Sequence, residues 1–269
     1  MSRADDLLEE TSKLGEAGDW QGVLQKLESG LAEFRESGTD EDAARILYEI
    51  GIVPEETVGY DRKLYAAREA ASIFERLGNL SDAAKALWRA AETQRDKADS
   101  LDDDDDPEAE SVRDAAVADF EKVVALYEQA GEELKSALTH FEIGQIYQVG
   151  PQDHGTALDQ YEVAEPVIRR LGKPEDIAQC LLYKGIALLE LQGGDEDLVA
   201  LLRESLDLHR QSKDNDGQSL AYQFLVEAAV TFDPEEAHRA AEEGLAFAQA
   251  TKDEFLARAI QDALARMED

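Results

Sequence analysis

The stretch SDAAKALWRAAE, residues 81–92, contains the pattern that decides the fold. Ala84, Leu87, Trp88 and Ala91 stand at offsets of 0, 3, 4 and 7, which place the four side chains on one face of an α-helix. The same order of an alanine, two bulky residues and a small residue recurs along the chain. Copies begin at Ala44, Ala84, Ala137, Ala178 and Ala221, with weaker copies at Ala4 and Ala257. The chain therefore contains an internal repeat of about 40 residues.

A second apolar helix is expected between consecutive copies. This second helix is expected to end at Gly38, Gly78, Gly131, Gly172, Ser212 and Thr251. The residues 4, 11 and 14 positions before each of these ends are all apolar or aromatic. Glycines at such ends are typical of left-handed helix caps, and the short turns that follow predict antiparallel neighbours. We expect an all-α protein, an α-solenoid of about six antiparallel helix pairs with a capping helix at about residues 254–268.

One repeat is longer than the others because it contains an acidic segment at about residues 99–111. Its five adjacent aspartates, Asp102–Asp106, repel one another and propagate a helix poorly, which predicts a solvated loop. The segment lacks the alternating ligands, central glycine and final glutamate of an EF-hand. Whether it binds cations is left open. No composition shift marks a second domain, so we expect residues 1–269 to form one solenoid domain.

The charge of the chain excludes several classes of partner. It has 61 Asp and Glu residues against 27 Lys and Arg, a formal net charge of −34. Nucleic acids and anionic membranes both require a basic surface, so we expect neither as a partner. The N-terminal residues have no apolar signal core, no run is long enough to span a membrane, and the single cysteine, Cys180, has no partner for a disulfide within the chain. These features favour a soluble cytoplasmic protein.

The same charge raises the question of whether the chain folds. A content of 43% hydrophobic residues with a large net charge lies near the boundary of disordered chains. The repeat answers this, because it gathers the apolar residues into two helical stripes and leaves the acids for outer faces and turns. Scarce lysine beside abundant acid is typical of proteins that work in concentrated salt, so we expect a halophilic source.

The repeat resembles that of the tetratricopeptide family. The first helix shows the family's bulky residue three positions before a Leu-Gly-like pair, and the second shows its small and aromatic residues. These residues are Leu47, Ile50 and Gly51; Leu87, Ala90 and Ala91; His140, Ile143, Gly144 and Tyr147; Ala67, Ala70 and Phe74; and Ala157, Tyr161 and Ala164. The resemblance covers about residues 4–264, with a repeat near 40 residues instead of the family's 34. It implies a right-handed solenoid whose first helices line a concave groove that binds peptides or helices.

Carried over by position, the resemblance places five large apolar residues toward the groove, namely Tyr48, Trp88, Phe141, Leu182 and Leu225. Two interpretations are open. The side chains pack against the neighbouring first helix, or they form an apolar groove for a partner, as the aromatic character of Tyr48 and Trp88 suggests. Ile52 and Glu92 stand where the family's groove asparagines would be, so a peptide-carboxylate clamp is not supported.

Basic residues are rare enough for their positions to be informative. Arg45 and Lys85 follow the alanines of two copies, and Arg89 and Arg95 lie further along the second of these helices. They are expected either to steer an acidic partner segment or to pair with nearby acids such as Glu49 and Glu92.

The sequence offers little catalytic chemistry. The four histidines are scattered, no His or Cys spacing fits a metal, and no glycine-rich phosphate loop is present. Cys180 and His140 occupy packing positions within helices, and we expect Cys180 to be buried and His140 to be partly buried. We therefore expect no enzyme activity, metal or cofactor.

The primary functional prediction is a protein-interaction scaffold that binds a peptide or partner helix. A self-associating structural solenoid, hence a homo-oligomer, is one alternative. A regulatory or ligand-sensing module is another, with a small molecule beside Trp88 or Tyr222.

Overall fold

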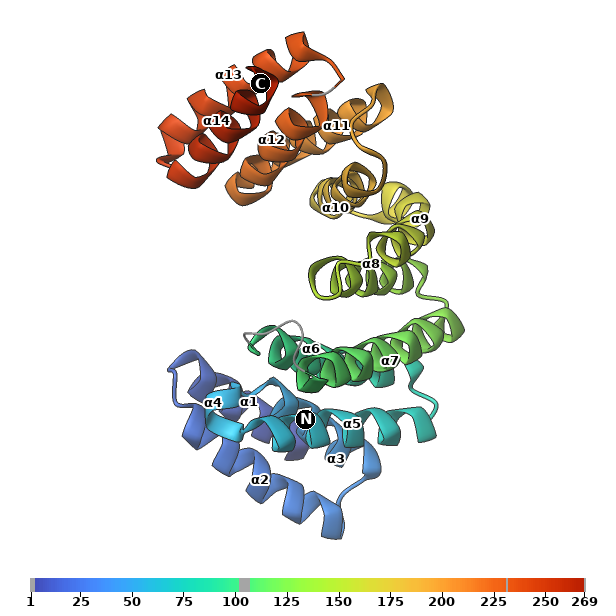
Figure 1. The fold of residues 1–269 in the computed structure, drawn as a ribbon. Helices are drawn as coiled ribbons and strands as arrows, with labels where there is room; N and C mark the ends of the chain where they lie inside the picture. Colours follow the sequence, from blue (N-terminus) through green and yellow to red (C-terminus); the bar gives the residue numbers. More distant parts are fainter. Residues whose placement is uncertain (1–2, 102–106, 231, 269) are drawn as a thin grey trace. The chain divides into compact units, whose positions relative to one another are not determined.

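The computed structural model describes residues 3–101, 107–230 and 232–268. Within these ranges the protein has fourteen helices and no strand (Figure 1). The chain divides into two compact units, Met1–Thr139 and His140–Asp269. The expectation of one domain over residues 1–269 stays a prediction. The aspartates Asp102–Asp106, expected to form a loop, lie outside the described residues.

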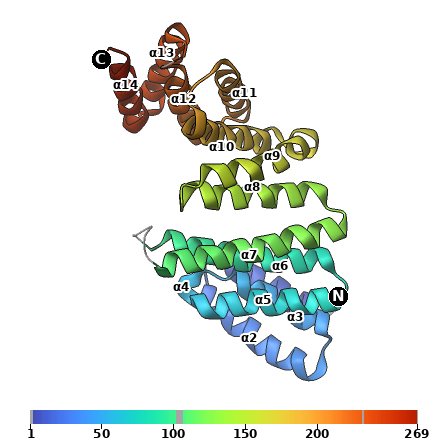
Figure 2. The same ribbon diagram turned by 45° about the vertical axis from the view of Figure 1, so that its right-hand side comes forward.

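The first unit consists of packed pairs of consecutive helices. Figures 1 and 2 show α5, α6 and α7 side by side, and the preceding helices α1, α2, α3 and α5 pack on one another in turn. In addition, α1 contacts α3 and α3 contacts α6, so the first helices of successive pairs form a layer. The bounds are α1 Arg3–Glu16, α2 Trp20–Ser37, α3 Asp40–Ile52, α4 Glu55–Val58, α5 Tyr60–Arg76, α6 Leu80–Asp99 and α7 Pro107–Ala130. The short α4 lies in the connection between α3 and α5.

Helix α8, Glu133–Val149, begins in the first unit and continues into the second. The second unit repeats the same plan, since α9 to α14 pack consecutively and α12 contacts both α10 and α14. The bounds are α9 His154–Leu171, α10 Pro174–Gln192, α11 Glu196–Ser212, α12 Asn215–Val230, α13 Pro234–Thr251 and α14 Glu254–Glu268. The last of these is the predicted capping helix.

The repeat pattern explains the core. The alanines Ala44, Ala84, Ala178 and Ala221 are fully buried, and Ala137 is nearly so. The small residue seven positions later lies against the following helix. A Cβ at Gly185 would come 2.6 Å from Cδ2 of Leu202, and a Cβ at Gly144 would overlap the ring of Tyr161. The position is small because the second helix of each pair crosses there at close range.

The predicted left-handed caps are correct at two of the four glycines named and wrong at the others. Gly78 and Gly131 have φ of 78° and 72°. Gly38 and Gly172 are instead extended, with φ of −100° and −76°, although the amide N–H of each still donates to a helix carbonyl, on Phe34 and Ile168 respectively. In α11 and α13 the left-handed residue is not glycine, since Lys213 and Lys252 have φ of 60° and 62°.

Candidate functional site

The candidate site is built from two helix faces in the first unit. On α3, Glu41, Arg45, Tyr48 and Glu49 lie at offsets of 0, 4, 7 and 8 and so share one face. On α6, Asp82, Lys85, Trp88 and Arg89 share a face in the same way. Since α3 and α6 are in contact, the two faces form one continuous surface.

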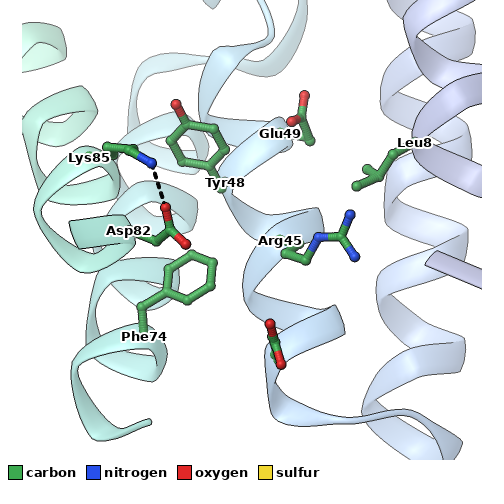
Figure 3. A pocket seen from close by; sticks show the side chains of 8 residues that line it. Leu8, Arg45, Tyr48, Glu49, Phe74, Asp82 and Lys85 are labelled. Carbon is green, nitrogen blue, oxygen red and sulfur yellow. Dashed lines mark hydrogen bonds and ion pairs between the residues drawn. The ribbon is translucent and has the colours of Figure 1, made fainter. Parts of the chain in front are cut away.

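The first cavity on this surface, here called the Glu49 cavity, has a volume of about 370 Å³. Figure 3 shows Tyr48, Glu49 and Arg45 on one helix, with Leu8 on one side of them and Asp82 and Lys85 on the other. Its lining residues are Leu8 of α1, Glu41, Arg45, Tyr48 and Glu49 of α3, Phe74 of α5, and Asp82 and Lys85 of α6.

The second cavity, here called the Trp88 cavity, has a volume of about 240 Å³ and adjoins the first, because Tyr48 and Lys85 line both. The lining residues are Tyr48, Lys85, Trp88, Arg89, Tyr127 of α7, and Lys135 and Leu138 of α8. Three aromatic rings and three cationic side chains thus surround one cavity in a chain with a net charge of −34.

The aromatic rings of the Trp88 cavity are held by the core. Trp88 meets the ring of the buried Phe120 edge-on, with centroids 5.2 Å apart. The ammonium of Lys135 lies 5.3 Å from the ring centroid of Tyr127, within cation–π range. Burial and the charge of Glu132 raise the pKa of Tyr127 to about 12. Tyr48 and Trp88 are partly exposed and pack with one side on the core, so each is both a packing residue and a surface residue.

The basic residues singled out in the sequence all have acidic partners. The ion pairs are Arg45–Asp5 at 2.8 Å, Lys85–Asp82 at 2.7 Å, Arg89–Glu92 at 2.8 Å and Arg95–Asp96 at 3.3 Å. Lys135 pairs with Glu132 in the same way. Local pairing, one of the two interpretations left open by the sequence, therefore describes these side chains.

Glu49 differs from the other charged residues of the surface. It is half-buried, and no hydrogen-bond donor or ion-pair partner for its carboxylate exists among the residues that the structure describes. Burial raises the pKa of Glu49, and the charges of Arg45 and Arg89 offset this only in part. The sequence suggested Glu49 as a partner for the cations, but Arg45 pairs with Asp5 instead.

The predicted groove residues of the second unit belong to its core. Phe141, Leu182, Tyr222 and Leu225 are 5%, 1%, 4% and 0% exposed. Phe141 lies against the rings of Tyr161 and Tyr183, while Tyr222 packs on Phe247 and accepts a hydrogen bond from Arg210. The packing interpretation thus describes these four positions, and we do not include them in the candidate site.

Several cavity residues were not identified as site residues from the sequence. A signal existed for Leu138, which follows Ala137 as Arg45 follows Ala44. A signal also existed for Lys135, which lies two residues before Ala137. Asp82 lies two residues before Ala84 in the same way, with the opposite charge. Leu8, Phe74 and Tyr127 were not identifiable in this way, because their contribution depends on how neighbouring helices cross.

A third cavity, of about 520 Å³, lies between α1 and α2. Its lining is mostly polar, with Leu7 and Phe34 as the large apolar residues. Among the charges that line it, Arg3 pairs with Glu33 and Lys26 with Glu10, and the carboxylate of Asp6 is exposed to solvent. This cavity therefore offers a ligand neither an extended apolar surface nor a half-buried carboxylate such as that of Glu49.

The two residues considered for chemistry are packing residues, as expected. Cys180 is 1% exposed, and burial raises the pKa of its thiol to about 12. His140 is half-buried, with Nδ1 2.7 Å from Oε1 of Gln160. Across the described ranges, no group of three or more His, Cys, Asp or Glu side chains is arranged to hold a metal ion. In the same ranges no helix combines the length and the apolar character that crossing a membrane requires.

Comparison with known proteins identifies the fold. No family model matches the chain, and no curated protein matches it. The apo form of RapI is similar in structure, with a TM-score of 0.68 at 10% identity over 99% of this chain and 98% of RapI. A signal transduction ATPase with numerous domains (STAND), a protein from Pyrococcus horikoshii with a tetratricopeptide repeat sensor, has a TM-score of 0.70 at 14% identity.

The match to the STAND protein covers 97% of this chain and 38% of that protein. At these identities the likeness concerns the fold alone. It agrees with the sequence in assigning an all-helical repeat architecture of the tetratricopeptide type.

Proposed function

We propose that the protein is an interaction scaffold that binds an extended segment of a partner protein across α3, α6 and the start of α8. The observation that carries this proposal is the pair of adjoining cavities that share Tyr48 and Lys85. Two neighbouring cavities suit a peptide that places two of its side chains side by side. The helices that form them are fixed by the core, so a segment binds a surface already in place.

The Trp88 cavity suits an apolar anchor of such a segment. Its lining presents Tyr48, Trp88 and Leu138. Tyrosine and tryptophan are among the side chains that contribute most to the binding energy of protein interfaces. The paired cations Lys85, Arg89 and Lys135 form a polar rim. An apolar centre with a polar rim is the usual arrangement of a binding surface.

The proposal is tested with peptides selected on the protein from a random display library of linear 12-residue sequences. Binding of a fluorescein-labelled selected peptide is measured by anisotropy for wild type, Tyr48→Ala and Tyr65→Ala. Tyr65 is a matched control, because it is an exposed tyrosine of the same unit on α5 and lines neither cavity. We expect Tyr48→Ala to weaken binding by ~10-fold or more and Tyr65→Ala to leave it unchanged.

Equal affinity of all three proteins for every selected peptide would contradict the proposal. Light scattering across a concentration range tests the structural alternative. A monomer that binds one peptide supports the scaffold. A stable oligomer that Tyr48→Ala dissociates would show instead that this surface serves self-association.

A further inference from the structure

The Glu49 cavity contains a charge that the protein itself does not neutralise. Arg45, Asp82 and Lys85 at its walls each have an ion-pair partner. Glu49 has none among the described residues, although it is half-buried, and Glu41 on the same helix face also has none. A carboxylate partly removed from water without a donor carries a desolvation cost, and a ligand that supplies a donor offsets it.

The rest of the lining suits the stem of a long basic side chain. Leu8, Tyr48 and Phe74 give the cavity an apolar side, and Figure 3 shows the ring of Tyr48 between Glu49 and Lys85. Lysine and arginine lay their methylene groups along such surfaces while their cationic ends remain at a polar site. A guanidinium beside Glu49 could also lie near the Tyr48 ring, an arrangement that is favourable in itself.

The net charge of the chain also favours a cationic ligand. With a net charge of −34 the chain as a whole attracts cations. The sequence suggested several cations for the recruitment of an acidic segment, among them Arg45, Lys85 and Arg89, but each of these three is paired with an acid of the chain. The unpaired groups at the site are thus the carboxylates.

We infer that the Glu49 cavity binds a lysine or arginine side chain of the partner segment, with its cationic end at Glu49 and its stem against Tyr48. This inference rests on the proposed function, and it gives the partner a chemistry: a basic residue beside an apolar one. The two cavities adjoin through Tyr48 and Lys85, so neighbouring side chains of one segment can occupy both.

The test uses an array of capped hexapeptides that are random except at one position, which holds arginine, citrulline or glutamate. Citrulline has nearly the shape of arginine without its charge. For wild type we expect arginine to bind ~10-fold or more better than citrulline at one position or more, the gain of a charge-assisted hydrogen bond. Glu49→Gln should abolish this preference. Glu75→Gln should keep it, because Glu75 is an exposed acid of α5 outside the cavity.

A second variant separates charge from packing. Glu49→Asp keeps the carboxylate and should retain a preference for arginine that Glu49→Gln lacks. Equal loss in both variants would overturn the inference, as would a preference for glutamate or one that survives Glu49→Gln. Arginine amide and spermidine serve as free cations in competition. If these free cations displace the bound peptide as effectively as the arginine peptides do, the cavity is a site for small cations, and this result would also overturn the inference.

The experiment distinguishes failure of the inference from failure of the proposed function. If Tyr48→Ala abolishes binding to the array while the arginine and citrulline peptides bind equally well, the proposed peptide-binding surface is supported and the inferred basic residue is contradicted. If Tyr48→Ala leaves array binding unchanged, the proposed function fails as well.

Discussion

Gly144 shows how a single residue sets the spacing between two helices. The buried ring of Tyr161 occupies the space in which a side chain at residue 144 would lie, and the hydroxyl of Tyr161 donates to Oε1 of Gln148 at 2.6 Å. Because both ends of the tyrosine are fixed, the ring has no free position to move into. The tolerance for any larger residue at this position is therefore small.

We predict that Gly144→Ala lowers the free energy of unfolding by ~1–3 kcal/mol, the usual cost of an extra methyl group in a filled core. The measurement is urea denaturation followed by circular dichroism. Gly155→Ala is the control, since the added Cβ would meet only Asp153 Oδ1, at 3.5 Å, near the exposed start of α9. It should be neutral or stabilising by up to ~1 kcal/mol, because alanine favours helix. Equal effects of the two substitutions would contradict the close-packing argument.

Glu49 gives a prediction of stability against pH. Burial raises the pKa of Glu49 in the folded state above its ordinary value of 4.5, so the folded protein binds the proton more tightly than the unfolded chain. Between the unfolded and folded pKa values the contribution of Glu49 to stability therefore falls as the pH rises. We expect Glu49→Gln to be more stable than wild type at pH 7, by no more than ~1 kcal/mol because part of the carboxylate remains solvated.

The advantage of Glu49→Gln should shrink as the pH is lowered from 7 toward 4, because the wild-type carboxyl then becomes neutral as well. Thermal melting of both proteins at each pH measures the difference, in which the other carboxylates cancel. Lower stability of Glu49→Gln at pH 7 would mean that the carboxylate has a stabilising partner.

At this scale the sequence identified packing positions better than exposure. The offsets of 0, 3, 4 and 7 located the buried alanines and the small residues correctly, because helical geometry alone determines which face a side chain takes. They could not separate Tyr48 and Trp88, which are partly exposed, from Leu182 and Leu225, which are buried at the equivalent position. Exposure depends on the size and approach of neighbouring side chains, such as those that enclose Leu182 and Leu225 in one apolar cluster.

At the scale of the element, the backbone conformation at the C-terminal end differs from one second helix to the next. The sequence placed the ends of these helices within two residues, but the backbone conformation at each end depends on the chain that follows. Where Lys213 or Lys252 takes the left-handed conformation, the amide N–H still donates to a carbonyl of the preceding helix. The hydrogen bond is thus made at the expense of backbone strain in a residue that has a Cβ.

We predict that Lys252→Gly stabilises the protein by ~0.5–1 kcal/mol. Glycine removes the strain of the left-handed conformation, which costs ~1–2 kcal/mol. It also gives the unfolded chain more conformational entropy, which lowers the stability of the folded state by ~0.4–1 kcal/mol. The measurement is again urea denaturation. Gly78→Ala is the reverse case, with φ of 78° and open space around the added Cβ, and should destabilise by a similar amount. A loss of stability in Lys252→Gly would show that the lysine side chain contributes more than the strain costs.

The second helices are also joined by arginine. Ion pairs between consecutive ones are Arg35–Glu69 from α2 to α5, Arg68–Asp119 from α5 to α7, Arg169–Glu204 from α9 to α11 and Arg203–Glu236 from α11 to α13. Part of the scarce positive charge is therefore used between repeats. The carboxylates of Asp119 and Glu236 are buried, whereas the other two pairs are more exposed. Exposed pairs contribute only ~0–1 kcal/mol each to stability and weaken in salt, so their loss opposes any stabilisation by salt only slightly.

At the scale of the whole molecule, the net charge of −34 dominates the response to salt. Most of the acids lie on exposed faces and repel one another, and unfolding relieves this repulsion by moving them apart. At ~0.1 M salt the Debye length of ~10 Å allows neighbouring acids to interact, whereas at ~1 M it is ~3 Å and removes most of the repulsion. The gain from screening the excess of like charges should exceed the loss from the exposed ion pairs, because each such pair contributes little to stability.

We therefore predict that the melting temperature is higher in ~2 M KCl than in ~0.1 M KCl. A control variant with five exposed acids replaced by glutamine, at Glu36, Glu75, Asp114, Glu121 and Asp262, should gain less from the salt. This comparison separates charge screening from a general effect of salt on apolar surface, because the latter acts equally on both proteins. Equal or lower stability of the wild type in ~2 M KCl would contradict the adaptation to concentrated salt inferred from the composition. The charge would then have to be explained by what the protein binds.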